Sequence, residues 1–381
     1  MKFLFTVATY YPLADGVQMV TQYTAEELVK MGHEVTVITS THNRNSFAQE
    51  HNGVRLIYTN IYKYHGIIRG HKKKYINLVI NEAKGKDVMI NVSLQTPTTD
   101  ILLPLLEKIS CKKVLYLHDI HDFKWHNTDI DSIRRILSKI YYDIFYRIYF
   151  AQIPRYLRKY NLITHLSPFD LSLNYMKRHG IMQNVIIGNA ALDSVFSKQK
   201  KGKLCTEDYF LYVANYASHK NQLFVLKAFY QSNLSNARMV FIGRQENSYY
   251  QFLRTEKKKL DQSIGQRKVD FLVGLSREET EQYIANANAM VLGSRIEKFP
   301  VVLIESIASK VPFIATDTGS VRYIPGGFIV KKEDEMAYWM KFILCNKASA
   351  QLLGESGYEY AIKNMTVRSK VNSLFKAIIQ C

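Results

Sequence analysis

Short apolar runs rich in β-branched and aromatic residues alternate with longer stretches of helical periodicity along the whole chain. This alternation predicts parallel β-sheets that are covered by helices on both faces. In the first half we expect strands at "KFLFTVA", "EVTVITS", "VRLIYTN", "DVMINVS", "KKVLYLHD" and "LITHLS". The second half starts the pattern again, with strands at "YFLYVA", "ARMVFIG", "VDFLVGL", "AMVLGS" and "PFIATD".

The repeated pattern predicts an α/β fold of two Rossmann-like, doubly wound domains that face each other across a cleft. A chain of 381 residues is long enough for each half to bury its own core. We place the boundary at Leu192, in "IIGNAALDSVFSKQKKGK", because an apolar strand gives way there to small, polar and basic residues. Ligands of such folds bind beyond the carboxyl ends of the strands, so the residues that follow each strand are the candidates for function.

The composition is that of a globular protein, with 47% hydrophobic and 22% charged residues. No apolar run approaches the ~20 residues that a membrane-spanning helix needs. The N-terminal "MKFLFTVATYYPLADG" is short and broken as an apolar run, which favours a core strand over a signal peptide. Four widely spaced cysteines indicate neither a disulfide framework nor a zinc site, which fits a reducing cytoplasm: Cys111, Cys205, Cys345 and Cys381.

The net charge of +18, from 51 Lys and Arg against 33 Asp and Glu, requires an explanation. Such an excess favours an anionic partner, which is a nucleic acid, a phosphorylated substrate or an acidic bilayer. The sequence contains no zinc motif, repeat or aromatic-basic recognition signature of the known nucleic-acid modules. We therefore expect no nucleic-acid partner and keep that class as the less favoured alternative.

Two strand ends in the first half carry candidate residues. In "VATYYPLADGVQMV", Gly16 precedes a helix over residues 17–31 and lets a ligand approach the backbone amides, although an ordinary tight turn also explains a glycine there. In "LYLHDIHDF", His118 is expected to bind substrate or take part in catalysis, with plain loop polarity as the alternative. Because no further cluster of ligands accompanies these His and Asp residues, we expect no metal.

The strand end in "YFLYVANYASHKNQLFVLKAF" places Asn215, His219 and Lys220 in a loop before a helix that begins near Asn221. A cation at a helix start is disfavoured by the helix dipole unless an anion lies beside it. Lys220 therefore predicts a phosphate, and a solvated surface lysine is the alternative.

Two carboxylates bracket an apolar run in "SRIEKFPVVLIESIASKVPFIATDTGS". Pro300 suits the first turn of a helix, which leaves Glu297 in the preceding loop and Glu305 inside the helix. Unpaired amides at the helix start favour a phosphate there, and we expect them at Phe299, Val301 and Val302. A carboxylate repels a neighbouring phosphate, so both glutamates are expected to accept hydrogen bonds from neutral hydroxyl groups, such as those of a sugar or a ribose. Hydroxyl acceptors around a diphosphate site predict a sugar nucleotide.

These residues and motifs resemble glycosyltransferase family four, a group of retaining, metal-independent enzymes with the glycosyltransferase B fold. The resemblance covers almost the whole chain: "MGHEVTVIT", the "HD" of His118 and Asp119, "IIGNAAL", "LYVANYASHKN", "MVFIG", and the two glutamates followed by "SIASKVPFIATDTGS". It implies an acceptor-binding domain over residues 1–192 and a nucleotide-sugar-binding domain over 193–360. It also implies a C-terminal helix over 361–381 that packs back towards the first domain.

The resemblance also implies roles for single residues. Glu305 would hold the ribose hydroxyls, Glu297 the transferred sugar, and Lys220 the diphosphate. Gly16 would present backbone to the donor or acceptor, and His118 would lie close to the reacting sugar. No cofactor or metal is expected, and the departing diphosphate helps to deprotonate the acceptor hydroxyl.

Five positions depart from the family pattern. Asp15 precedes Gly16 where the first loop usually has a pair of glycines, and Ser320 follows Gly319 where a later turn usually has another pair. Asn215 stands where the family commonly has an arginine, which leaves Lys220 with less help unless His219, Arg244 or Arg295 replaces it. Lys298 stands at a frequent glycine, and Pro300 replaces a second glycine and removes one amide donor. These changes bear on how the phosphate is held more than on the fold.

The stretch "IRRILSKIYYDIFYRIYFAQIPRYLRKY" keeps apolar residues on one helical face and arginines and lysines elsewhere. One interpretation buries the apolar stripe against the first domain; the other places it on the anionic inner face of the membrane, helped by "HKKK" at residues 71–74. We expect transfer from a UDP- or GDP-sugar to a lipid-linked saccharide or other glycan acceptor, in cell-surface polysaccharide synthesis. A sugar-nucleotide epimerase on the same fold is the alternative.

Overall fold

The computed structural model describes residues 1–12, 16–41, 48–126, 129–130, 132–197 and 207–381. Within them the chain forms two compact units: unit 1 is Met1–Gly188 with Val367–Cys381, and unit 2 is Asn189–Thr366. This division precedes the boundary at Leu192 that the sequence predicted. Asn189 and Ala191 already belong to unit 2, because the Asn189 side chain bonds to Phe299 and Ala191 pairs with Thr366. Asp15 and Cys205 lie outside the described residues.

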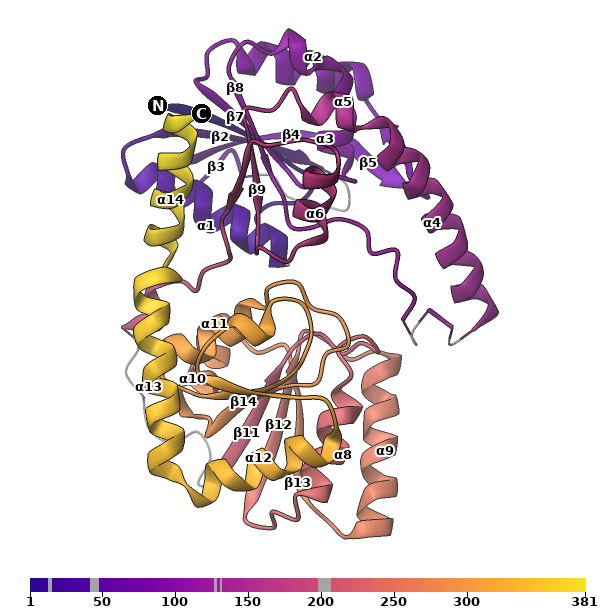
Figure 1. Ribbon diagram of the computed structural model, residues 1–381, viewed down its shortest axis with the longest axis vertical. Coiled ribbons are helices and arrows are strands. Elements are labelled where there is room, and N and C mark those ends of the chain that lie inside the picture. The colour runs from indigo at the N-terminus through magenta and orange to yellow at the C-terminus, as the bar shows by residue number, and fades with distance from the viewer. Residues whose placement is uncertain (13–15, 42–47, 127–128, 131, 198–206) are drawn as a thin grey trace. The chain divides into compact units, whose positions relative to one another are not determined.

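Unit 1 is built on an eight-stranded sheet in the order β10-β9-β8-β7-β1-β2-β4-β3. Figure 1 shows helices packed around this sheet. The neighbours run parallel except for β3 and β4. From β1 the chain winds outward through β2 and β4, and it then returns to the other side of β1 with β7. The strands are β1 Lys2–Val7, β2 Glu34–Ser40, β3 Glu50–His51, β4 Val54–Thr59, β7 Val88–Val92, β8 Lys112–Tyr116, β9 Leu162–His165 and β10 Asn184–Ile186.

Helices cover this sheet because its central strands are apolar on both faces; β7, for example, is buried along its whole length. The helices are α1 Gly16–Lys30, α2 Lys72–Ala83, α3 Pro97–Asp100, η1 Leu103–Lys108, α4 Ile133–Gln152, α5 Pro154–Leu157, α6 Leu171–Arg178 and the C-terminal α14 Val367–Gln380. Helix α14 lies beside α1 in Figure 1, and Lys112 Nζ donates to the Ile378 and Cys381 carbonyls. The end of the chain is therefore part of unit 1.

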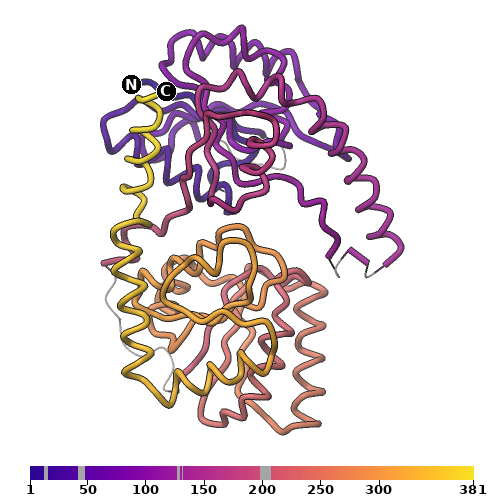
Figure 2. Tube along the Cα trace, viewed as in Figure 1, coloured from indigo at the N-terminus to yellow at the C-terminus, as the bar shows by residue number. Residues whose placement is uncertain are grey.

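One helix of unit 1 extends away from its sheet. The C-terminal end of α4 adjoins α5 and contributes the buried Phe150, whereas its N-terminal end extends outward, as the trace in Figure 2 shows. A separate hairpin, β5 Ile61–Tyr64 and β6 Ile67–Gly70, packs on α4: Gly66 faces the Phe145 ring, and Tyr141 Oη donates to the His65 carbonyl at 3.3 Å. Among the described residues, no helix has the length and apolar character that crossing a membrane requires.

Unit 2 contains a six-stranded parallel sheet in the order β13-β12-β11-β14-β15-β16. Its strands are β11 Asp208–Val213, β12 Ala237–Gly243, β13 Lys268–Val273, β14 Ala289–Leu292, β15 Phe313–Thr316 and β16 Gly327–Val330. Its helices are α7 Asp193–Phe196, α8 Gln222–Gln231, α9 Ser248–Ile264, α10 Arg277–Asn286, α11 Val301–Ala308, η3 Val321–Tyr323, α12 Glu333–Cys345 and α13 Lys347–Asn364. The chain winds outward from β11 to β13 and returns on the other side of β11 with β14. The crevice of this doubly wound sheet therefore lies between the ends of β11 and β14.

Candidate active site

The strand ends at the crevice of unit 2 carry an ion pair. Lys220 follows β11 and Glu297 follows β14, and Lys220 Nζ donates to Glu297 Oε1 at 2.8 Å. The Glu297 side chain is 9% exposed and that of Lys220 is 25% exposed. The sequence predicted that both residues lie in the loops before helices, and the structure confirms this placement. The structure also brings them into contact. The sequence did not reveal this contact, because the two residues are 77 positions apart.

Buried polar contacts hold the Lys220 turn against β14. The hydroxyl of Tyr212, in β11, donates to the Lys220 carbonyl and lies 3.0 Å from Ser294 Oγ. Asn221, in the left-handed conformation, caps α8 and donates from Nδ2 to the Gly293 carbonyl at 3.2 Å. Because both loops share these contacts, the ammonium and the carboxylate are positioned together.

The loop that carries Glu297 is fixed along its backbone. Asn189 Nδ2 donates to the Phe299 carbonyl at 2.8 Å, and the Ser320 amide donates to the Lys298 carbonyl at 3.0 Å. Gly319 adopts a left-handed φ of 54°, and a Cβ there would clash with the Glu297 carbonyl. The glycine of "DTGS" therefore has a packing role, because it lets this loop approach.

Helix α11 begins at Val301, and Pro300 is its N-cap in an extended conformation. The sequence placed Pro300 inside the first turn, so the helix starts one residue later than predicted. Val301 and Val302 occupy the first two helical positions, and Phe299 lies in the loop before the cap. Of the three predicted amides, those of Val301 and Val302 belong to the first turn, where amides have no partner within the helix.

Glu305 is buried inside α11, as the sequence predicted, and it is paired with Arg277 at the start of α10. Arg277 Nη2 donates to Glu305 Oε1 at 2.5 Å, and Arg277 Nε donates to Glu281 Oε1 at 2.7 Å. Burial raises the pKa of Glu305, and Arg277 opposes that rise without cancelling it. Sequence reasoning missed Arg277. The sequence could have indicated it, because a cation in the first turn of a helix is disfavoured by the helix dipole, and the same argument had identified Lys220.

Asn215 stands where the family commonly has an arginine, and the residues around Lys220 show which side chain could replace that cation. Asn215 is exposed, and its carbonyl accepts from Gln222 Nε2 at 3.0 Å. Burial and Lys220 lower the pKa of His219, so this imidazole is neutral near pH 7. Arg295 is exposed, and its amide donates to the His219 carbonyl at 2.8 Å, which brings Arg295 to the Lys220 turn.

Unit 1 has its own crevice between the carboxyl ends of β1 and β7. A cavity of about 460 Å³ lies there, and its lining includes Thr9, Gly16, Ser93 and Thr96. Gly16 does not adopt the left-handed conformation, and a Cβ there would contact nothing within 4 Å. Neither the backbone conformation nor the packing requires a glycine at this position. Its missing side chain leaves space at the edge of the cavity.

His118 follows β8 in the same unit, and its Nε2 is buried without a hydrogen-bond partner among the described residues. Burial lowers the pKa of His118 to about 4, so the ring is neutral at physiological pH. The neighbouring polar residues have structural partners: Asp119 Oδ1 accepts the Ser172 amide, and His121 Nε2 lies 2.8 Å from Asp143 Oδ1. In the described part of the chain no three His, Cys, Asp or Glu side chains gather as metal ligands.

The loop after β7 was not singled out from the sequence. Ser93 and Gln95 have φ values of 61° and 64°, a conformation that costs free energy outside glycine. Asp100 Oδ1 accepts the Gln95 amide at 2.9 Å, and Lys63 Nζ donates to the Gln95 carbonyl at 3.1 Å and to Asp100 Oδ2. A buried ion pair thus holds this loop beside Gly16. Polar residues in a "SLQTPTTD" loop do not indicate such strain, which explains why it was missed.

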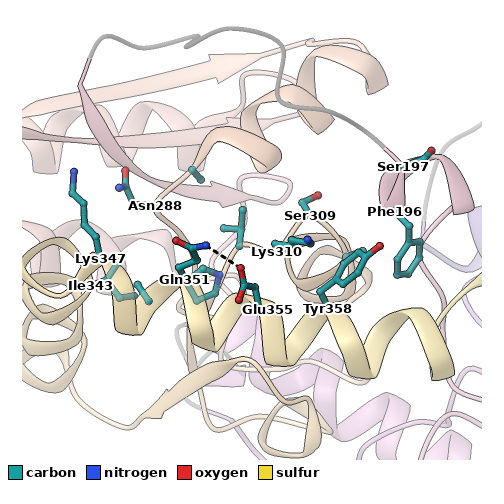
Figure 3. A pocket seen from close by; sticks show the side chains of 15 residues that line it. Phe196, Ser197, Asn288, Ser309, Lys310, Ile343, Lys347, Gln351, Glu355 and Tyr358 are labelled. Carbon is teal, nitrogen blue, oxygen red and sulfur yellow. Dashed lines mark hydrogen bonds between the residues drawn. The ribbon is translucent and has the colours of Figure 1, made fainter.

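A cavity of unit 2, of about 650 Å³, lies at the edge of its sheet opposite Lys220 and Glu297 (Figure 3). Asn288 and Val311 line it just before β14 and β15, and Gln351 and Glu355 of α13 face it. Since ligands of doubly wound sheets bind at the carboxyl ends of the strands, this cavity is not the candidate active site.

The comparisons with known proteins bear on unit 2 and on the fold. Residues 193–360 match the model of the family described as glycosyl transferases group 1. Most of unit 2 is therefore similar to a group 1 glycosyltransferase domain. Comparison with curated proteins finds no match by sequence.

Solved structures of glycosyltransferases resemble the whole chain. Sucrose-phosphate synthase from Thermosynechococcus elongatus has a TM-score of 0.74 at 16% identity, over 100% of this chain and 98% of that one. HepE of Anabaena, in complex with UDP and glucose, has a TM-score of 0.72 at 14% identity, with 100% of both chains covered. WaaG, a glycosyltransferase involved in lipopolysaccharide biosynthesis, has a TM-score of 0.65 at 15% identity, with 99% of both covered.

At these identities the structures show the fold alone, and it is the predicted glycosyltransferase B fold of two Rossmann-like domains. The group 1 domain coincides with the range that the sequence assigned to the nucleotide sugar, residues 193–360. The narrower resemblance to family four, and the roles given to single residues, stay predictions.

Proposed function

We propose that this glycosyltransferase takes a sugar from a UDP- or GDP-sugar and transfers it, with retention of configuration, to a hydroxyl of a lipid-linked saccharide or other glycan. The observation that supports the donor half is the Lys220–Glu297 ion pair in the loops before α8 and α11, with Glu305 buried further along α11. Anabaena HepE has been solved in complex with UDP, with UDP and glucose, and with UDP-glucose, which supports a uridine nucleotide.

The chemistry follows from the charges at this edge. The leaving diphosphate gains negative charge as the glycosidic bond breaks, and Lys220 with the first amides of α11 stabilises that charge. Arg295 is the proposed second cation in place of the arginine that Asn215 replaces. Glu297 shares Lys220 with the diphosphate and accepts hydrogen bonds from hydroxyls of the sugar.

Unit 1 supplies the acceptor side. The neutral ring of His118 has a free Nε2, which suits a hydrogen bond with a sugar hydroxyl and avoids placing a cation beside an oxocarbenium-like centre. The acceptor hydroxyl passes its proton to the departing diphosphate, so no carboxylate nucleophile is required. This proposal involves no cofactor and no metal.

The acceptor proposal rests on the outward face of α4. Much of its apolar stripe is solvent-exposed: Ile133 is 77% exposed, and Leu137, Ile140, Tyr141, Ile144 and Ile148 are exposed with it. The rest of the stripe packs on unit 1, because Phe145 lies against Gly66 and Tyr149 against the core. The stripe is thus buried against unit 1 only in part, whereas one interpretation of the sequence buried it throughout. Exposed basic residues accompany it, at Arg134 and Arg147 on α4 and at Lys72, Lys73 and Lys74 beside the hairpin. We propose that this face lies on the anionic inner surface of the membrane.

A panel of nucleotide sugars tests the donor half of the proposal. We expect UDP- or GDP-sugars to raise the melting temperature and to be hydrolysed slowly without acceptor, and Glu305→Ala to abolish both effects. An epimerase would instead convert the donor sugar without any acceptor. If no nucleotide sugar binds and Glu305→Ala leaves every activity intact, the assignment is wrong.

A further inference from the structure

Arg277 presents an unused hydrogen-bonding surface beside Glu305. Its side chain is 41% exposed, whereas those of Glu281 and Glu305, which hold it, are 8% and 7% exposed. A guanidinium has five N–H donors. The structure uses Nε for Glu281 and one Nη2 hydrogen for Glu305, which leaves three donors without a partner among the described residues.

The position of Arg277 matches the donor site. It is the first residue of α10 and comes directly after the loop that follows β13. It therefore lies at the same carboxyl edge of the sheet as Lys220 and Glu297. Two carboxylates orient the guanidinium, so little side-chain entropy is lost when it binds a ligand. Any hydroxyl that bonds to the Glu305 carboxylate comes within reach of the Arg277 Nη groups.

We propose that Arg277 is a donor-binding residue that recognises the ribose of the nucleotide together with Glu305. This inference rests on the proposed function. A hydroxyl both donates and accepts, and a carboxylate alone can only accept. Glu305 accepts hydrogen bonds from the ribose hydroxyls, and Arg277 donates hydrogen bonds to their oxygens. The pair therefore satisfies both the donors and the acceptors of a vicinal diol.

Arg277 has a second effect through charge. Glu281 and Glu305 approach the same guanidinium from α10 and α11, and both are buried. Without Arg277 the pKa of Glu305, already raised by burial, would rise further, because the cation that lowers it is gone and Glu281 raises it. Protonated Glu305 would lose part of its capacity to accept from the ribose.

Calorimetric titration with UDP, GDP and their 2′-deoxy forms tests this inference. The wild type is expected to bind the ribonucleotides about ten- to a hundredfold more tightly than the deoxy forms. In Arg277→Gln the affinity for UDP or GDP and this discrimination both fall, and the affinity recovers as the pH rises from 6 to 8.5. Arg277→Lys keeps the charge and therefore shows no such pH dependence, although its discrimination is weaker.

Arg254→Gln is the matched control, since Arg254 is an exposed arginine on α9 that stacks on Tyr250. Thermal melting shows that each variant is folded, and Arg277→Lys carries the test if Arg277→Gln is not. A wild type that binds neither UDP nor GDP contradicts the proposed function itself. A wild type that binds them, with Arg277 variants unchanged in affinity and in discrimination, overturns only the inference on Arg277.

Discussion

Lys220 and Glu297 share one hydrogen bond in the structure, and each is proposed to bind a different part of the donor. An ammonium beside a developing diphosphate charge contributes most in the transition state, where that charge is largest. We expect Lys220→Ala to lower the rate of transfer or of donor hydrolysis by about a hundred- to a thousandfold. Lys258→Ala, at an exposed lysine of α9, should leave the rate unchanged. Equal rates in the two variants would remove Lys220 from the mechanism.

The protonation state of His118 is a second prediction at this scale. Because burial lowers its pKa to about 4, the folded protein binds this proton less readily than the unfolded chain, whose histidines titrate near 6.5. The neutral ring therefore contributes stability above pH 6.5, and the contribution is lost as the pH falls towards 4. It amounts to about 2 kcal/mol between pH 7 and pH 5.

An NMR titration of the histidine rings measures this pKa, with His118→Gln to assign the signal. We expect a midpoint near 4 for His118. A midpoint near 6.5 would show a solvated ring, and the proposed neutral contact with the sugar would then lose its support.

At the scale of elements, the strand pattern predicted most of the fold. All eleven strands expected from the sequence are present, because buried parallel strands leave continuous apolar runs. The hairpin β5–β6 was missed because "IYKYHGIIRG" mixes polar and apolar positions and pairs only with itself. Strand β16 was missed because it has four residues and begins at the second glycine of a pair, Gly327.

The site was predictable only in part, because the sequence shows which residues follow each strand but not which distant residues come into contact. Motif order identified Lys220, Glu297 and Glu305, since each follows a strand or lies in the helix after it. The contacts of Arg277 with Glu305 and of Lys63 with Gln95 join distant segments, and no spacing along one chain reveals them. Exposure of the α4 stripe likewise depends on what the fold leaves uncovered.

Gly319 tests how rigidly the Glu297 loop must be held. Alanine there meets both an unfavourable φ and a clash with the Glu297 carbonyl, so the loop must shift. Gly274→Ala is the matched control, because Gly274 has a φ of 70° but open space at Cβ. Gly274→Ala should lose about 1–2 kcal/mol of stability from its backbone conformation, and Gly319→Ala should lose more because of the clash. Only Gly319→Ala should also lose more than tenfold in donor affinity, measured by titration with UDP; equal affinities would separate Gly319 from the site.

Helix α4 carries the membrane prediction. Co-sedimentation should show binding to vesicles that contain phosphatidylglycerol and little binding to phosphatidylcholine alone. Replacing Ile133, Leu137 and Ile144 together by serine should weaken binding more than tenfold, since each side chain loses apolar contact with the bilayer. Leu352→Ser, at an exposed leucine of α13, serves as the control. Wild type that stays in the supernatant with anionic vesicles contradicts the proposal.

At the scale of the whole molecule, two opposite edges of the unit 2 sheet are the candidates for the nucleotide site. The proposed edge combines the Lys220 turn, the Glu297 loop and the starts of α10 and α11. The opposite edge holds the cavity between α13 and the strand starts. The net charge of +18 does not choose between them, because it favours any anionic ligand.

Hydrogen exchange of the full chain with and without saturating UDP or GDP distinguishes these edges most directly. We predict slower exchange at residues 217–224, 275–279 and 295–306, and unchanged exchange along α13. Protection confined to α13 and the strand starts near Asn288 and Val311, or no protection by either nucleotide, would contradict it.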